Sequence, residues 1–113
     1  MRVICFVVLP EGVGEIEGKL LQIIVEDVSY ADRQATVIAR RRVRPEELPY
    51  DGRQLGPIVL EADLPDPTAR YNLRAILSSG EALAIGDLIS TRSYPLPTSE
   101  DEATVVIHVQ RQD

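Results

Sequence analysis

Residues 70–77 read Arg-Tyr-Asn-Leu-Arg-Ala-Ile-Leu, and their apolar side chains recur at every second position, Tyr71, Leu73, Ala75 and Leu77. This period of two is typical of a β-strand that buries one face, because successive side chains of a strand point to opposite sides. Comparable short apolar stretches recur along the whole chain of 113 residues. We therefore predict seven strands: Arg2–Leu9, Lys19–Val28, Gln34–Val43, Pro57–Leu64, Arg70–Leu77, Leu83–Thr91 and Ala103–Gln110.

Turn-forming residues separate these predicted strands. Residues 30–33 fit a hairpin turn, whereas Pro45, Pro49 and Asp51-Gly52 favour a longer crossover between sheets. The composition, 44% hydrophobic and 27% charged, fits one packed domain. The expected fold is all-β: a single-domain antiparallel β-sandwich of about seven strands over residues 1–113, with an Ig-like or similar Greek-key topology. Residues 81–84 could instead start a short helix.

Side-chain parity predicts which residues enter the core. The inward set is Leu21, Ile23, Val25, Val37, Ala39, Ile58, Leu60, Ala62, Leu64, Tyr71, Leu73, Ala75, Leu77, Leu83, Ile85, Ile89, Val105, Ile107 and Val109. Asp87 shares the inward parity of its strand, and a buried carboxylate needs hydrogen-bond donors. Arg92 and Tyr94 follow it, and Arg74 lies on the preceding strand. We expect a structural hydrogen-bond network at Asp87 or, alternatively, a ligand-binding site.

The first predicted strand differs from the others because both of its faces are apolar. Residues 3, 5 and 7 can enter the core, while Ile4, Phe6 and Val8 form a second apolar set. Adjoining loops could cover this second set. Alternatively, the set and the unpaired edge of the strand contact another polypeptide, either a partner protein or a second copy of the chain in a homodimer. A protein-binding surface at Ile4, Phe6 and Val8 is our leading hypothesis.

A small-ligand or glycan-binding protein is the second hypothesis. The connection from Arg44 to Gly56 supplies Tyr50 and Arg53, an aromatic surface and a cation for a polar ligand. Asp87 and Tyr94 supply further polar groups. A purely structural homo-oligomer is a third interpretation.

The charge of the chain argues against nucleic acid as a partner. The formal net charge is −6, so the overall field repels phosphate backbones and anionic lipids. The contrary feature is the run Arg40, Arg41, Arg42 and Arg44, which on a strand places Arg41 on one side and the others on the opposite side. These arginines form a solvated face paired with nearby carboxylates or, alternatively, a site for an acidic partner. No stretch approaches the roughly 20 apolar residues of a membrane span.

Residues that could carry catalysis are scarce. His108 is the only histidine, so metal sites built from clustered His and Cys are not expected. The serines lack a Gly-x-Ser-x-Gly motif, and the glycine spacing matches no phosphate-binding loop. We therefore expect a protein that is not an enzyme and needs no cofactor.

Cys5 is the lone cysteine and cannot form an internal disulfide bond. The residues before it, Arg2 to Ile4, do not form a lipobox, and the apolar stretch is short for a signal peptide. We expect a cytoplasmic protein from the sequence as written. If the natural chain starts before Met1, a periplasmic or lipid-anchored protein is expected instead.

Several motifs between about residues 20 and 97 resemble a known family. They are Val25-Glu26-Asp27-Val28-Ser29, Ala31-Asp32, Val37-Ile38-Ala39, Ile58 to Leu64, Tyr71-Asn72-Leu73-Arg74-Ala75, and Asp87 with Tyr94-Pro95-Leu96. They resemble the YbaY/YscW-like family, which includes type III secretion lipoprotein chaperones (pilotins). The resemblance implies a small β-sandwich without enzymatic activity and, in the better understood relatives, assistance to an outer-membrane secretin. Relatives are usually exported and lipid-anchored, which differs from the expectation drawn from Met1 to Leu9.

Overall fold

The computed structural model describes residues 1–30, 32–80 and 86–112. This part of the chain is all-β, as expected, apart from one 3₁₀ helix of three residues. Its elements are β1 (Arg2–Val8), β2 (Leu20–Asp27), β3 (Thr36–Val43), the 3₁₀ helix η1 (Pro45–Glu47), β4 (Gln54–Glu61), β5 (Tyr71–Ser78), β6 (Leu88–Ser90) and β7 (Glu102–Arg111). The predicted second strand is β2. The alternative helix start at residues 81–84 lies outside the described residues.

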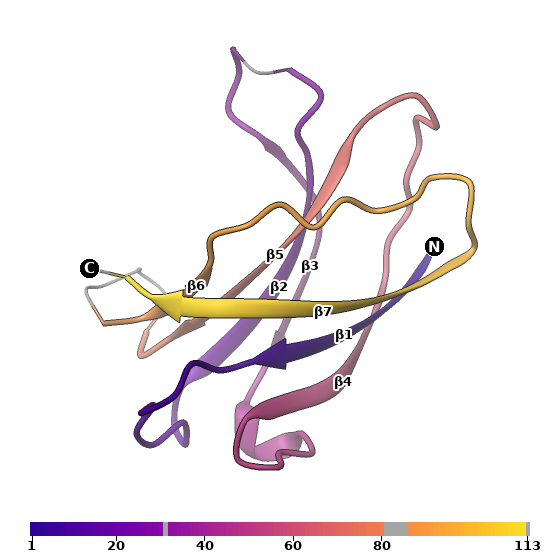
Figure 1. Ribbon diagram of the computed structural model, residues 1–113. Helices are drawn as coiled ribbons and strands as arrows, with labels where there is room; N and C mark the ends of the chain where they lie inside the picture. Colours follow the sequence, from indigo (N-terminus) through magenta and orange to yellow (C-terminus); the bar gives the residue numbers. More distant parts are fainter. Residues whose placement is uncertain (31, 81–85, 113) are drawn as a thin grey trace.

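The seven strands form one curled sheet in the order β3-β2-β5-β6-β7-β1-β4. The long strand β7 joins the two halves, because residues 102–108 pair with β1 and residues 109–111 pair with β6. Figure 1 shows β7 and β1 in front of β2, β3 and β5, so the curled sheet makes the two layers expected of a sandwich. The β1–β7 pair is parallel, unlike the other pairings, and in this detail the sheet departs from a wholly antiparallel one.

The core lies between the two layers and follows the alternation of the strands. Its buried members are Val3, Cys5, Val7, Leu9, Leu21, Ile23, Val25, Val43, Leu55, Ile58, Leu60, Ala62, Tyr71, Leu73, Ala75, Leu77, Leu88, Leu96, Ile107 and Val109. Each large apolar side chain that is fully buried stabilises the fold by roughly 1.5–3 kcal/mol. Most of the predicted core is therefore confirmed, with two differences on β3 and β6.

Val37 and Ile89 are the residues at which side-chain parity was wrong. Val37 is 45% exposed because a bulge in the β2–β3 pairing pairs Val37 with Glu26 and leaves Ile38 as the extra residue. Ile89 is only half-buried, and Leu88 takes the core position instead. The predicted core positions 83 and 85 lie outside the described residues.

Strand β4 begins three residues earlier than predicted, at Gln54 instead of Pro57. The β1–β4 pairing contains an irregularity, since Cys5 pairs with Ile58 but Val7 pairs with Leu55. Gly56 occupies this irregularity with a φ of +131°, a conformation that other residues rarely adopt. The strand therefore runs through Gly56, which the sequence pattern had placed in the connection before the predicted start at Pro57.

Candidate protein-binding surface

Strand β1 is flanked on both sides, by β4 and by β7. The unpaired edge that the sequence suggested for this strand is therefore not present, and edge-to-edge pairing through β1 is excluded. The two edges of the curled sheet are β3 and β4. Arg41 bridges them, because its guanidinium donates a hydrogen bond to the carbonyl oxygen of Val59. What remains of the hypothesis for β1 is its outward face.

The outward side chains of β1 are the predicted residues Ile4, Phe6 and Val8, and all three are half-buried. Their neighbours follow from the strand register. Ile4 lies opposite Val59 of β4, and Phe6 lies opposite Val106 of β7. The structure thus adds two apolar residues to the predicted three, and we name the surface of Ile4, Phe6, Val8, Val59 and Val106 the apolar face.

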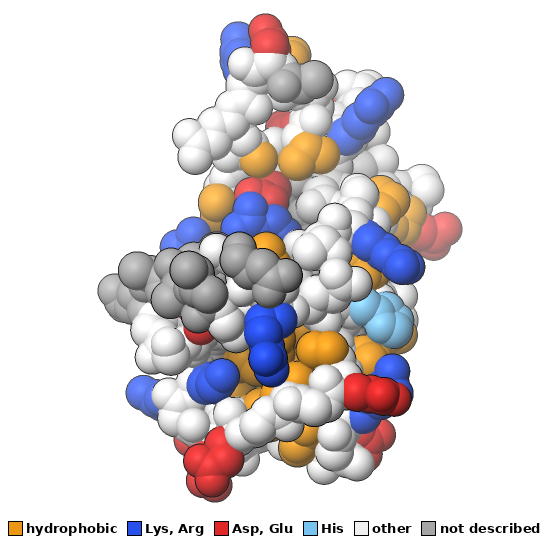
Figure 2. Space-filling view, turned by 60° about the vertical axis from the view of Figure 1, so that its left-hand side comes forward, with side chains coloured by type: hydrophobic (Ala, Val, Ile, Leu, Met, Phe, Trp, Pro, Cys, Tyr) orange, Lys and Arg blue, Asp and Glu red, His pale blue; other side chains and the backbone are white. Residues whose placement is uncertain are grey.

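The apolar face is partly open to solvent and has a polar rim. Val106 is 44% exposed and lies beside Phe6. The rim includes Thr104 and His108 on β7, which lie opposite Ile4 and Val8 and are exposed. Figure 2 shows hydrophobic side chains at the surface between charged ones. An exposed apolar surface with a polar rim is typical of a protein-interaction site.

The predicted ligand residues Tyr50 and Arg53 lie together in the connection between η1 and β4. The Tyr50 hydroxyl donates a hydrogen bond to the Gly52 carbonyl, 2.9 Å away, and Arg53 makes an exposed ion pair with Glu11 at 3.8 Å. A cavity of about 260 Å³ is lined by Pro49, Tyr50, Asp51, Gln54 and Gly56. Hydrogen bonds from the backbone N–H groups of Gln54 and Arg53 lower the pKa of the Asp51 carboxyl, which fixes it in this turn.

The other two predicted ligand residues, Asp87 and Tyr94, lie outside that cavity. Asp87 is buried, as parity predicted, and accepts a hydrogen bond from the backbone N–H of Ser79 at 3.3 Å. The Tyr94 hydroxyl accepts one from the backbone N–H of His108 at 2.8 Å. Arg74 makes its ion pair with a glutamate of β2. These residues therefore brace separate parts of the fold and do not converge with Tyr50 and Arg53 on one site.

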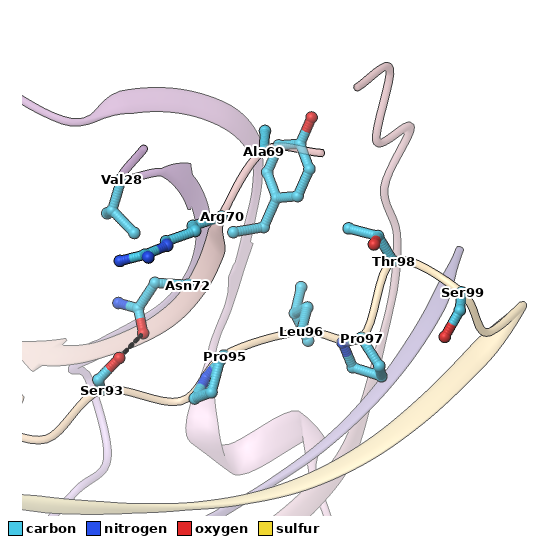
Figure 3. A pocket seen from close by; sticks show the side chains of 11 residues that line it. Val28, Ala69, Arg70, Asn72, Ser93, Pro95, Leu96, Pro97, Thr98 and Ser99 are labelled. Carbon is cyan, nitrogen blue, oxygen red and sulfur yellow. Dashed lines mark hydrogen bonds between the residues drawn. The ribbon is translucent and has the colours of Figure 1, made fainter. Parts of the chain in front are cut away.

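A second, larger cavity of about 490 Å³ lies between the start of β5 and the loop that precedes β7 (Figure 3). It is lined by Val28, Ala69, Arg70, Tyr71, Asn72, Ser93, Pro95, Leu96, Pro97, Thr98 and Ser99. No site was predicted here, although several of these residues belong to the motifs Tyr71-Asn72 and Tyr94-Pro95-Leu96. Motifs separated along the chain gave no signal that they share one cavity.

Asn72 holds the loop that forms one wall of this cavity. Its Oδ1 atom accepts hydrogen bonds from the backbone N–H of Tyr94, at 2.7 Å, and from the hydroxyl of Ser93, at 3.0 Å (Figure 3). The backbone of Leu73 also donates to the Tyr94 carbonyl, and that of Leu96 donates to the Tyr71 carbonyl. The loop thus runs along β5 in the manner of an irregular strand.

The remaining polar groups form no metal-binding cluster among the residues that the structure describes. His108 is exposed on β7, and Cys5 is fully buried. Burial raises the pKa of the Cys5 thiol to about 12. No helix in the described ranges is long and apolar enough to cross a membrane.

Comparisons with known proteins agree with this architecture. No protein-family model matches the chain, and the search of curated proteins gave no match. Among solved structures, the fold is similar to that of an alternative pilotin from the type II secretion system of Vibrio cholerae, with a TM-score of 0.67. The two chains are 17% identical, and the match covers 97% of this chain and 96% of the other. The chain therefore has a pilotin-like fold, as the motif resemblance implied.

Proposed function

We propose that this chain is a non-enzymatic, protein-binding module of the pilotin type and that the apolar face of the β4–β1–β7 layer is its docking surface. The observation that carries the proposal is the outward row of apolar side chains on β1, continued by Val59 and Val106 on its two neighbours. A central strand that is covered on one face needs no apolar residues on the other. An apolar segment of a partner protein would bury these side chains.

The fold supports the same role at a coarser level, since a similar fold belongs to a secretion pilotin. Fold alone does not determine function, so the apolar face itself is the main support for this role. The more specific proposal is that the chain is a YbaY/YscW-like protein that assists a secretin as a chaperone. That proposal assigns a protein partner, a periplasmic or lipid-anchored location and no cofactor, and a cytoplasmic chain would need another partner.

The proposal can be tested by site-specific photo-crosslinking in cells of the source organism. A benzoyl-phenylalanine at Val106 probes the apolar face, and one at Tyr30 is the control, because Tyr30 is an exposed aromatic residue in the connection between β2 and β3. We expect a crosslinked partner protein from position 106 and none from position 30. The same adducts from both positions, or none from position 106, would contradict the proposal.

A second candidate function is the binding of a small molecule in the cavity between β5 and the loop before β7. Its volume of about 490 Å³ lies within the range of small-molecule sites, roughly 300–1,000 Å³, and its lining mixes apolar and hydrogen-bonding groups. A thermal-shift screen of sugars and metabolites tests it. A ligand that stabilises the wild type but not a Val28→Trp variant, in which a larger side chain occupies the cavity, is the expected result.

A further inference from the structure

The outward face of the other layer, formed by β3, β2 and β5, carries a cluster of arginines. Arg40 of β3 and Arg74 of β5 lie on either side of Ile24 in the strand register. Arg42 lies two residues further along β3, on the same side. Arg70 precedes β5, and Figure 3 shows its side chain beside that of Asn72. We name Arg40, Arg42, Arg70 and Arg74 the arginine face.

This positive charge is poorly balanced within the face. Glu26 is the only acidic residue at the outward positions of β2, β3 and β5, and its carboxylate makes an ion pair with Arg74 at 3.6 Å. Arg42 donates to the amide oxygen of Gln22 at 3.4 Å, which leaves its charge uncompensated. In the described part of the chain, Arg40 and Arg70 form no ion pair. Because the whole chain has a net charge of −6, the residues outside the arginine face carry a larger negative charge than this total.

The β2 residues beneath these arginines are largely buried. Ile24, Gln22 and Glu26 are 4%, 7% and 7% exposed, although they point away from the core. The aliphatic parts of long arginine side chains cover such positions while the guanidinium groups stay in water. The strand register therefore sets the positions from which the side chains of Arg40, Arg42 and Arg74 extend.

We propose that the arginine face binds an acidic, extended segment of a partner polypeptide. Arg40 and Arg42 are two residues apart on one strand, so a segment with carboxylates at alternate positions matches their spacing of about 7 Å. Arginine pairs with carboxylates in a planar, two-bond geometry. No aromatic side chain lies at the outward positions of β2, β3 and β5 to stack on bases, and the overall negative charge repels nucleic acid. This surface lies on the opposite layer from the apolar face and is independent of the function proposed there.

The test measures binding of a fluorescein-labelled oligo-glutamate of about eight residues, which as a strand is long enough to cross three strands of the sheet. We expect binding by fluorescence anisotropy at about 0.05 M salt that weakens steeply by about 0.3 M, because salt screens exposed charges. The double variant Arg40→Gln/Arg42→Gln should bind about tenfold more weakly. The control Arg33→Gln/Arg53→Gln removes the same charge elsewhere and should bind within about twofold of the wild type.

Four results would overturn the proposal. They are no binding of the oligo-glutamate at low salt, equal losses in the two double variants, equal or tighter binding of an oligothymidylate of the same length, and self-association. Self-association would mean that the arginine face binds a second copy of the chain, through the exposed acidic turn at residues 100–102. Sedimentation of the wild type would then show a dimer, and the variant Glu100→Gln/Glu102→Gln would reduce it. Circular dichroism confirms that each variant is folded.

Discussion

Cys5 shows how burial on the inward side of β1 changes the chemistry of a side chain. Its thiol is fully buried, and this burial raises its pKa from the reference value of 9.0 to about 12. The folded protein therefore keeps a proton on Cys5 at a pH where the unfolded chain has lost it. Because the pKa is raised in the folded state, the free energy of unfolding must fall as the pH rises between these two values.

We predict that Cys5→Ala removes this pH dependence. The difference in free energy of unfolding between the wild type and Cys5→Ala should be constant below about pH 8 and narrow by about 1.4 kcal/mol at pH 10. Urea unfolding of both proteins at several pH values measures it. A difference that stays constant up to pH 10 would show that the thiol can ionise in the folded state.

Gly56 is a second residue whose identity the local geometry dictates. Its φ of +131° disfavours any side chain, and a Cβ atom at this position would lie 2.8 Å from the carbonyl oxygen of Cys5. We predict that Gly56→Ala lowers the free energy of unfolding by about 2–4 kcal/mol. Gly18→Ala is the control, since Gly18 has a φ of +77° and open space around it, and it should cost about 1 kcal/mol. Equal losses in urea unfolding would contradict the argument from the contact.

Individual residues were predictable from the sequence where alternation alone decided their environment. Asp87 was expected to be buried and is buried, and the outward apolar set on β1 was recognised from its parity. Val37 was not predictable, because one extra residue in a bulge moves a valine from the core to the surface without changing the sequence pattern. The partner of Tyr94 was not predictable either, because it depends on β7 lying beside the loop that contains Tyr94.

At the scale of elements, the loop before β7 is held to β5 as if it were an additional strand. Backbone hydrogen bonds join Leu73 to Tyr94 and Leu96 to Tyr71, and the side chain of Asn72 adds two more. Most strands were predictable from an apolar period of two, and β1 was predictable from a continuous apolar run. The parallel β1–β7 pair and the placement of this loop were not, because they depend on contacts between the two ends of the chain.

We predict that Asn72→Ala loosens this loop. The substitution leaves the half-buried backbone N–H of Tyr94 without its acceptor, which should cost about 1–3 kcal/mol in urea unfolding. Faster hydrogen exchange at Tyr94 should accompany the loss. Ser93→Ala removes only an exposed donor to the same oxygen and should cost less than about 1 kcal/mol. Similar stability of Asn72→Ala and the wild type would show that the backbone hydrogen bonds alone hold the loop to β5.

At the scale of the molecule, the two layers present different surfaces to solvent. One layer exposes Val106 beside half-buried apolar neighbours. The other layer exposes arginines above the buried residues Gln22, Ile24 and Glu26 of β2. Composition predicted neither surface, because a net charge of −6 averages over both. An apolar surface and a basic surface on opposite layers would allow one partner to contact the module through two chemically different segments.

The decisive comparison is between Val106→Asp and Tyr30→Asp, which place the same charge at an exposed residue of the apolar face and at an exposed residue of the connection between β2 and β3. Each immobilised variant is incubated with extract of the source organism, bound proteins are identified by mass spectrometry, and circular dichroism confirms the fold. We predict that a protein retained by the wild type and by Tyr30→Asp is lost with Val106→Asp. Equal retention by both folded variants would contradict a docking role for the apolar face.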